Sequence, residues 1–175
     1  MNIKKLKAGM LTFGFLLVST AMWAQGSKPS PAATATGTVN GANITINYSS
    51  PAVKGRKIWG GLVPFGQVWR AGANEATVFK TDKKIMVEGK ALAAGSYSIY
   101  AIPGEKTWKI IFNAETGQWG TTHDGVTTRV PAKDVLAVTV TPVKTKTLEE
   151  RLKYEVTPKG IALIWENLSV PVTIK

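Results

Sequence analysis

Apolar and polar residues alternate over short runs along most of this chain. Within residues 43–48, two isoleucines and a tyrosine alternate with threonine and asparagine, and residues 136–140 repeat the pattern with leucine and valine. Successive side chains of a strand point to opposite faces, so a period of two predicts a strand with one buried face. A chain made of such runs is expected to bury its apolar side chains between packed sheets.

Turn residues divide the chain into strands, which we expect at 34–39, 43–48, 77–80, 85–87, 96–102, 108–113, 134–143, 148–156, 161–165 and 170–174. Asn40-Gly41 tolerates positive φ and predicts a hairpin between the first two strands. Residues 81–83 are expected to join the third and fourth strands as a hairpin, and the fifth strand is expected to pair with the sixth. A turn at 157–160 favours a strand over the alternative, a helix at 147–153. About ten short strands predict an all-β, antiparallel β-sandwich, of which a jelly roll is one form.

The N-terminal residues have the three parts of a secretory signal peptide. Three lysines within residues 4–7 precede an apolar run at 8–18, and small residues follow. The apolar run is shorter than the roughly 20 residues that span a bilayer, so we expect no transmembrane anchor after cleavage. Cleavage after Ala24, or alternatively after Ala21, would place the protein in the periplasm or outside the cell.

The composition of the chain limits the kinds of fold, metal site and partner that it can have. Cysteine is absent, which excludes disulfides, thiolate metal sites and a lipid anchor on cysteine. We expect a signal peptide at 1–24, a flexible leader at 25–33 and one domain at 34–175, long enough to bury roughly 70% of its unfolded surface. The net charge is +11, but the lysines are scattered, so we expect solvated surface charge and no nucleic-acid partner.

The segment 49–75 is long, irregular and rich in glycine, and it combines aromatic with polar side chains. Flat apolar faces beside a few hydrogen-bonding groups are typical of a site for a sugar or another small organic molecule. The alternative is structural: the aromatics plug one end of the sandwich, Arg70 pairs with Glu75 or caps carbonyls, and Asn74 bonds to loop backbone. The candidate binding residues are Lys54, Arg56, Trp59, Trp69, Arg70, Asn74 and Glu75, with Phe65 as a further aromatic.

Signals for catalysis are weak. His123 is the single histidine, and Asp124-Gly125 after it is a common turn dipeptide, which favours an exposed turn over acid–base chemistry. No nucleophile elbow or phosphate-binding glycine loop occurs. One histidine and no cysteine make a metal centre unexpected. We therefore assign no catalytic residue, no metal ligand and no cofactor.

Several segments resemble a known bacterial family. The chain carries SPAVKGRKIWGGLVPFGQVWRAGANEAT at 50–77, VEGKALAAGSYSIYAIP at 87–103, WKIIFN at 108–113 and LIWEN at 163–167. Together these resemble the family catalogued as domain of unknown function 2911, with WRAGAN at 69–74 as the most specific part. The resemblance implies a small exported β-sandwich protein of Gram-negative bacteria, and it transfers no catalytic residue.

Three hypotheses for function remain open at this point. The first is a non-catalytic module that binds a small molecule, a glycan or an envelope protein through the segment 54–75. The second is a hydrolase-like enzyme acting on glycan, with Glu75 as acid or base and Arg70 as an electrostatic stabiliser. The third is a structural envelope protein with its tryptophans in the core.

Overall fold

The structure is a computed structural model that describes residues 28–175. The expected signal peptide, both of its candidate cleavage sites and the start of the leader lie outside this range. The prediction of an all-β fold with about ten strands is confirmed. The elements are β1 (Ala32–Val39), β2 (Ala42–Ser49), β3 (Thr77–Thr81), β4 (Ile85–Val87), β5 (Lys90–Leu92), β6 (Gly95–Ile102), β7 (Trp108–Asn113), a short 3₁₀ turn η1 (Pro131–Lys133), β8 (Asp134–Val140), β9 (Val143–Thr157) and β10 (Gly160–Thr173).

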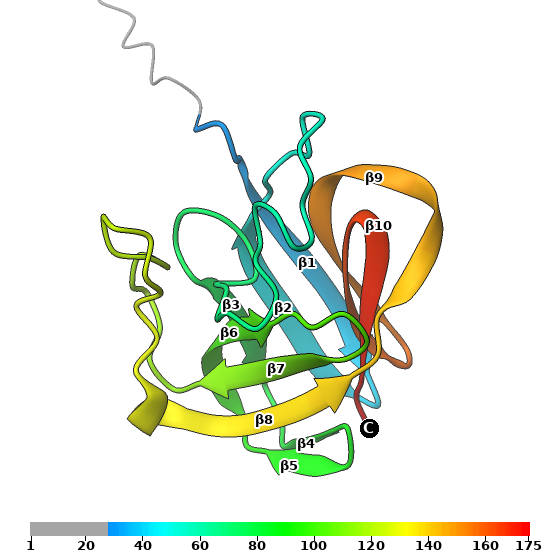
Figure 1. The fold of residues 1–175 in the computed structure, drawn as a ribbon. Coiled ribbons are helices and arrows are strands. Elements are labelled where there is room, and N and C mark those ends of the chain that lie inside the picture. The colour runs from blue at the N-terminus through cyan, green and yellow to red at the C-terminus, as the bar shows by residue number, and fades with distance from the viewer. Residues whose placement is uncertain (1–27) are drawn as a thin grey trace, which may run out of the picture.

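Six strands form one antiparallel sheet in the order β1-β2-β3-β6-β7-β8 (Figure 1). The order follows the chain except for the hairpin β4–β5, which leaves the sheet between β3 and β6. This sheet is a meander rather than the crossed arrangement of a jelly roll. The predicted hairpin at Asn40-Gly41 is confirmed, and both turn residues have positive φ, 48° and 79°.

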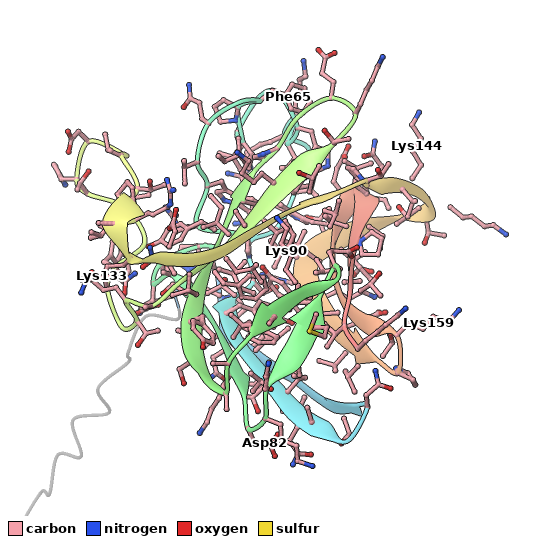
Figure 2. All side chains as sticks on the ribbon, turned by 90° about the horizontal axis from the view of Figure 1, so that it is seen from below. Phe65, Asp82, Lys90, Lys133, Lys144 and Lys159 are labelled. Carbon is pink, nitrogen blue, oxygen red and sulfur yellow. The ribbon has the colours of Figure 1, made fainter. Side chains whose placement is uncertain are left out.

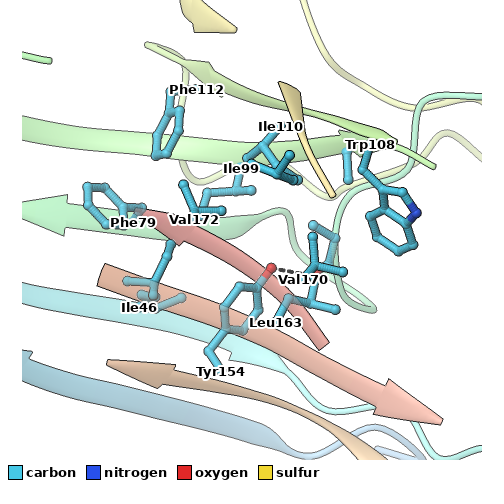
Figure 3. Close-up of a cluster of buried hydrophobic side chains, with 14 of the residues drawn as sticks. Ile46, Phe79, Ile99, Trp108, Ile110, Phe112, Tyr154, Leu163, Val170 and Val172 are labelled. Carbon is cyan, nitrogen blue, oxygen red and sulfur yellow. Dashed lines mark hydrogen bonds between the residues drawn. The ribbon is translucent and has the colours of Figure 1, made fainter. Parts of the chain in front are cut away.

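The second layer is the long hairpin β9–β10, which faces the six-stranded sheet. Figure 3 shows buried side chains meeting from both layers: Phe79, Ile99 and Phe112 come from the sheet, whereas Leu163 and Val172 come from β10. All five are less than 5% exposed. The molecule is therefore the expected β-sandwich, with its core between these two layers.

β10 is one strand where the sequence predicts two. Its pairing with β9 shifts register on both sides of Glu166, which has a φ of 55°. Such a bulge bends the strand and interrupts the alternation of its side chains. The interruption explains why the sequence pattern breaks between the expected strands 161–165 and 170–174.

The predicted hairpin between 77–80 and 85–87 is wrong. β3 is an interior strand that pairs with β2 on one side and β6 on the other, so neither of its edges is free for β4. β4 instead pairs with β5 through Glu88-Gly89, whose φ values of 46° and 77° suit a two-residue turn. Val87 also bridges Ile174 beyond the end of β10.

The long segment between β2 and β3 is tied to the body at three places. Ala52 bridges Arg151 of β9, Trp69 bridges Ala101 of β6, and Glu75 bridges the loop between β7 and β8 at Trp119. Figure 1 shows the segment between β2 and β3 at the top of the view and the loop after β7 at the left. Backbone pairing therefore holds the expected functional segment in place and sets it against the loop after β7.

Charged side chains project from different parts of the surface. Figure 2 shows Lys90, Lys133, Lys144 and Lys159 on separate elements around the molecule. Within residues 28–175, no helix has the length and apolar character needed to cross a bilayer.

Candidate functional site

A pocket of about 430 Å³ lies between the segment 51–73 and the loop that follows β7. Its apolar lining includes Leu62, Val63, Pro64, Val68, Trp69 and Trp165. Its polar lining includes Ser30, Arg56, Gln67, Arg70, Thr121 and Thr127. Three of the predicted residues, Arg56, Trp69 and Arg70, therefore meet in one cavity.

A cluster of four tryptophans underlies the pocket. Trp69 and Trp165 stack with their ring centroids 6.0 Å apart and an angle of 19° between their planes. Trp59 packs edge-on against both of them and against Trp108, with a centroid separation of 4.8 Å for the last pair. These rings come from the loop, β7 and β10, so the cluster joins both layers at this end of the sandwich.

Trp69 reaches the cluster because its backbone continues the sheet. β3 pairs with β6 only as far as Ile99, and Trp69 takes its place beside the end of β6. The N–H of Trp69 donates to Ala101 O at 2.7 Å, and the N–H of Ala101 donates to Trp69 O at 2.8 Å. Because side chains alternate along this extended piece, Trp69 packs into the main core while Val68 packs against the small cluster on the other face of the sheet.

Arg70 is the polar centre of the pocket. Its guanidinium is half-buried, and Nη1 donates to Thr121 Oγ1 at 3.0 Å. Its Nε is buried and has no hydrogen-bond partner among residues 28–175. Burial lowers the pKa of Arg70, yet an arginine keeps its charge in a protein. Of the two possibilities that the structural alternative offered for Arg70, the ion pair with Glu75 does not form, because Glu75 pairs with Lys28.

A glycine lets Arg70 lie against the neighbouring loop. A Cβ on Gly120 would lie 2.2 Å from Cδ of Arg70 and 2.8 Å from its Cβ, closer than real atoms approach. The N–H of Gly120 donates to Asn74 O at 3.0 Å, so the two loops touch along their backbones here. Gly120 therefore permits the contact that positions Arg70.

Arg56 is an exposed cation that lines the pocket. Its Nε donates to Val53 O at 3.0 Å, and its Nη2 donates to Ala52 O. Neither Arg56 nor Arg70 forms an ion pair with a carboxylate in the described part of the chain. Two positive charges thus border one cavity, and no carboxylate among residues 28–175 pairs with either of them.

Asn74 and Glu75 hold the residues before β1. Asn74 Nδ2 donates to Ser30 O at 3.0 Å, and Lys28 Nζ donates to Glu75 Oε1 at 2.8 Å. The hydrogen bond from Lys28 lowers the pKa of Glu75. Lys28 also lies 5.3 Å from the ring centre of Trp119. These contacts bind residues 28–31 to the body, and β1 begins at Ala32, within the stretch 25–33 expected to be a flexible leader.

The remaining predicted residues lie outside the pocket lining. Trp59 is only 8% exposed and supports the cavity from the core, as in the structural alternative. Lys54 is exposed, and its backbone N–H donates to Glu150 Oε1 at 2.9 Å. Phe65 lies at the edge of the molecule (Figure 2) and covers Gly60. His123 is exposed in a turn, as the sequence predicts.

Sequence reasoning missed residues that come from other parts of the chain. Trp165, Thr121 and Ser30 line the pocket but lie on β10, on the loop after β7 and before β1. Their place depends on long-range packing, and no local pattern marks them. Leu62, by contrast, lies in the predicted segment, but nothing about an apolar residue there indicated that its side chain would be 48% exposed.

Within residues 28–175, histidine, aspartate and glutamate do not gather in a group of three that could hold a metal ion. Comparisons with curated proteins and with solved structures gave no match. A family model described as "Protein of unknown function (DUF2911)" matches residues 30–174, which span β1 to β10 and every residue of the pocket. The chain therefore belongs to the DUF2911 family.

Proposed function

We propose that this protein is a binding module that holds a small ligand in the pocket around Arg70. The observation that carries the proposal is the composition of that pocket, in which a half-buried guanidinium with an unpartnered Nε lies among apolar walls. A volume of about 430 Å³ falls within the roughly 300–1,000 Å³ of small-molecule sites.

A purely structural role accounts poorly for Arg70. A buried N–H donor without a partner costs free energy, and the cost is larger on a charged group, roughly 1–3 kcal/mol or more. Arg70 makes one side-chain hydrogen bond, to Thr121, and no ion pair within the described residues. A structural role alone leaves this cost without compensation, whereas a ligand acceptor at the accessible part of the guanidinium would stabilise its charge.

The contacts of Glu75 favour binding over the hydrolase-like alternative. Its carboxylate binds Lys28, and its side chain lies on the face that carries β1 and β2 instead of lining the pocket of Arg70. The lowered pKa keeps Glu75 ionised near neutral pH, which opposes a role as general acid.

Intrinsic tryptophan fluorescence tests the proposal, because Trp69 and Trp165 line the pocket. A library of sugars, short peptides and organic acids should contain compounds that shift the emission saturably. Arg70→Ala should weaken the response, whereas Lys54→Ala removes a positive charge outside the pocket and should retain it.

Two results would overturn the proposal. One is the absence of any saturable shift across the library. The other is an emission shift that persists unchanged in folded Arg70→Ala or Arg70→Met variants.

Export is part of the same proposal and rests on residues 1–24. The protein recovered from its natural host should begin at Gln25, or at Met22 if cleavage follows Ala21. Intact mass spectrometry of the periplasmic and secreted fractions would determine the first residue of the mature protein. A cytoplasmic protein that retains residues 1–24 would contradict export without affecting the binding proposal.

A further inference from the structure

We propose that the ligand of this pocket is an organic anion, with its acid group at Arg70 and an apolar body against Leu62, Val63 and Trp69. The inference rests on the proposed binding function and specifies its ligand class. Three features of the described residues carry it: the donor character of the Arg70 guanidinium, the charge of the lining and the shape of the apolar wall.

The unpartnered atoms near the pocket are hydrogen-bond donors. Among residues 28–175, five buried side-chain nitrogen or oxygen atoms lack a partner, and four of them are N–H groups. Two of these, Arg70 Nε and Trp165 Nε1, belong to residues that line the pocket, and Trp165 is 1% exposed. The other two belong to Trp59 and Trp108 in the cluster beneath. These four N–H groups have almost no accessible surface, so a ligand would contact Arg70 through the other nitrogens of its half-buried guanidinium. Those nitrogens are also donors, and an ionised acid group offers them acceptors alone.

The lining carries positive charge without negative charge. Arg56 and Arg70 line the cavity, and the described lining includes no aspartate or glutamate. Other acids around the lining are engaged elsewhere: Glu75 binds Lys28, Glu150 accepts from the N–H of Lys54, and Glu166, next to Trp165, accepts from the N–H of Asn167. Asp124 precedes Gly125 of the lining but is itself exposed and outside it. A half-buried cation in such surroundings favours an anion and disfavours a cation.

The apolar wall indicates that the anion has a hydrophobic body. Val63 is buried, but Leu62 is 48% exposed at the cavity, and Trp69 is half-buried there. A free inorganic anion would leave this surface in water, whereas a flat or branched apolar group would cover it. The combination of a donor centre with an apolar wall fits an amphiphilic acid.

A matched pair of probes tests the charge and the body separately. 2-Naphthoate and 2-naphthamide have the same ring system, but only the first is an anion near neutral pH. Calorimetric titration of the wild type should show naphthoate binding roughly tenfold or more tightly, the difference expected for hydrogen bonds to a charged donor. Arg70→Met keeps most of the side-chain volume and should abolish the preference.

Two further variants serve as controls for this interpretation. Lys54→Gln removes one positive charge from the same segment outside the lining, and it should keep the preference for naphthoate. Gly120→Ala displaces Arg70 without removing it and should reduce the preference even if Arg70→Met proves unstable. Circular dichroism melting curves show which variants are folded.

The outcomes distinguish the inference of an anionic ligand from the proposed binding function. Equal affinity for acid and amide, a preference that persists in Arg70→Met, or an equal loss in Lys54→Gln would overturn the anion inference. So would neutral library compounds that bind the pocket while neither naphthalene probe does. These results leave the binding function standing, whereas a library without any pocket ligand overturns the binding function itself.

Discussion

Arg70 depends on the unusual backbone of the residue that follows it. Ala71 has a φ of 53° in the left-handed region, which a residue with a Cβ adopts at some cost. Two hydroxyl groups hold it there, because Thr77 Oγ1 donates to Ala71 O at 2.9 Å and the hydroxyl of Tyr154 donates to the same oxygen at 2.8 Å. The backbone is thus turned immediately after Arg70, and the conformation is fixed from the core.

Gly120→Ala is predicted to move Arg70 from its position. Its new Cβ would lie 2.2 Å from Arg70 Cδ, so Arg70 must shift and the overpacking should lower the free energy of unfolding by about 1–3 kcal/mol. Naphthoate affinity should fall as well, measured by calorimetry. Gly117→Ala is the control: φ is 89° and a Cβ there meets nothing, so it should lose stability through the backbone but retain binding. Equal binding by both variants would contradict the positioning of Arg70.

Among individual residues, the sequence predicted part of the pocket lining but not the directions of the other side chains. Arg56, Trp69 and Arg70 were expected to act together and do line one pocket. The segment 49–75 has no period, so nothing in it showed that Trp59 packs inward or that Glu75 lies on another face. Trp165 could not be assigned, because its contact with Trp69 forms only when β10 folds onto the sheet.

Among the elements, the loop between β7 and β8 forms one wall of the pocket and is fastened at its base. Asn113 is fully buried at the end of β7, and its Nδ2 donates to Val130 O and to Asp134 Oδ1, both at 2.8 Å. Arg129 Nε also donates to Asp134 Oδ1, at 3.0 Å, and Arg129 forms an ion pair with the same carboxylate. This polar group closes the loop that carries Gly120 and Thr121.

Asp134→Asn is predicted to weaken the attachment of this loop. It should also make the free energy of unfolding less dependent on pH in acid. Burial raises the pKa of Asp134, but hydrogen bonds from Arg129 and Asn113 outweigh it and lower the pKa below the ordinary 3.8. The ionised form is therefore favoured by folding, so its contribution is present above the ordinary pKa and lost as pH falls through the lower folded value.

Urea unfolding from pH 7 to pH 3 checks this prediction. The variant should be less stable at pH 7, by roughly 1–3 kcal/mol as for hydrogen bonds to charged groups, and should change less than the wild type below about pH 4. Asp82→Asn serves as the comparison variant, because it replaces an exposed carboxylate that accepts a hydrogen bond from Asn43. A variant whose stability falls with acid as steeply as that of the wild type would contradict the assignment.

The strands themselves could be predicted from alternation, but their partners only in part. Pairs joined by short turns, such as β1–β2 and β6–β7, were expected and are present. The pairing of 77–80 with 85–87 was wrong because the third strand is enclosed by β2 and β6, a long-range fact. The bulge at Glu166 likewise concealed the continuity of β10.

For the whole molecule, the tryptophan cluster joins the two layers of a sandwich without disulfides. Trp108 from β7 and Trp165 from β10 are each 1% exposed, and both contact Trp59. Trp108 lies at one end of the cluster of core side chains in Figure 3. Because the chain has no cysteine, packing of this kind carries the stability of the domain.

Trp108→Ala is predicted to remove about 3–5 kcal/mol from the free energy of unfolding, as for other large-to-small changes in cores. That loss is a large part of the roughly 5–15 kcal/mol typical of a domain. Trp119→Ala is the matched control, because Trp119 is 50% exposed and should cost far less. Urea denaturation of both variants measures the difference, and similar losses would refute a supporting role for the cluster.

The central claim is that Arg70 receives the acid group of a small organic anion at the end of this sandwich. A crystal structure of the protein with 2-naphthoate tests it most directly. We predict a carboxylate oxygen at about 2.7–3.2 Å from a guanidinium nitrogen of Arg70, with the rings against Leu62 and Trp69. Naphthoate bound elsewhere, or Arg70 paired with a protein carboxylate and the cavity filled by the protein's own side chains, would contradict the claim.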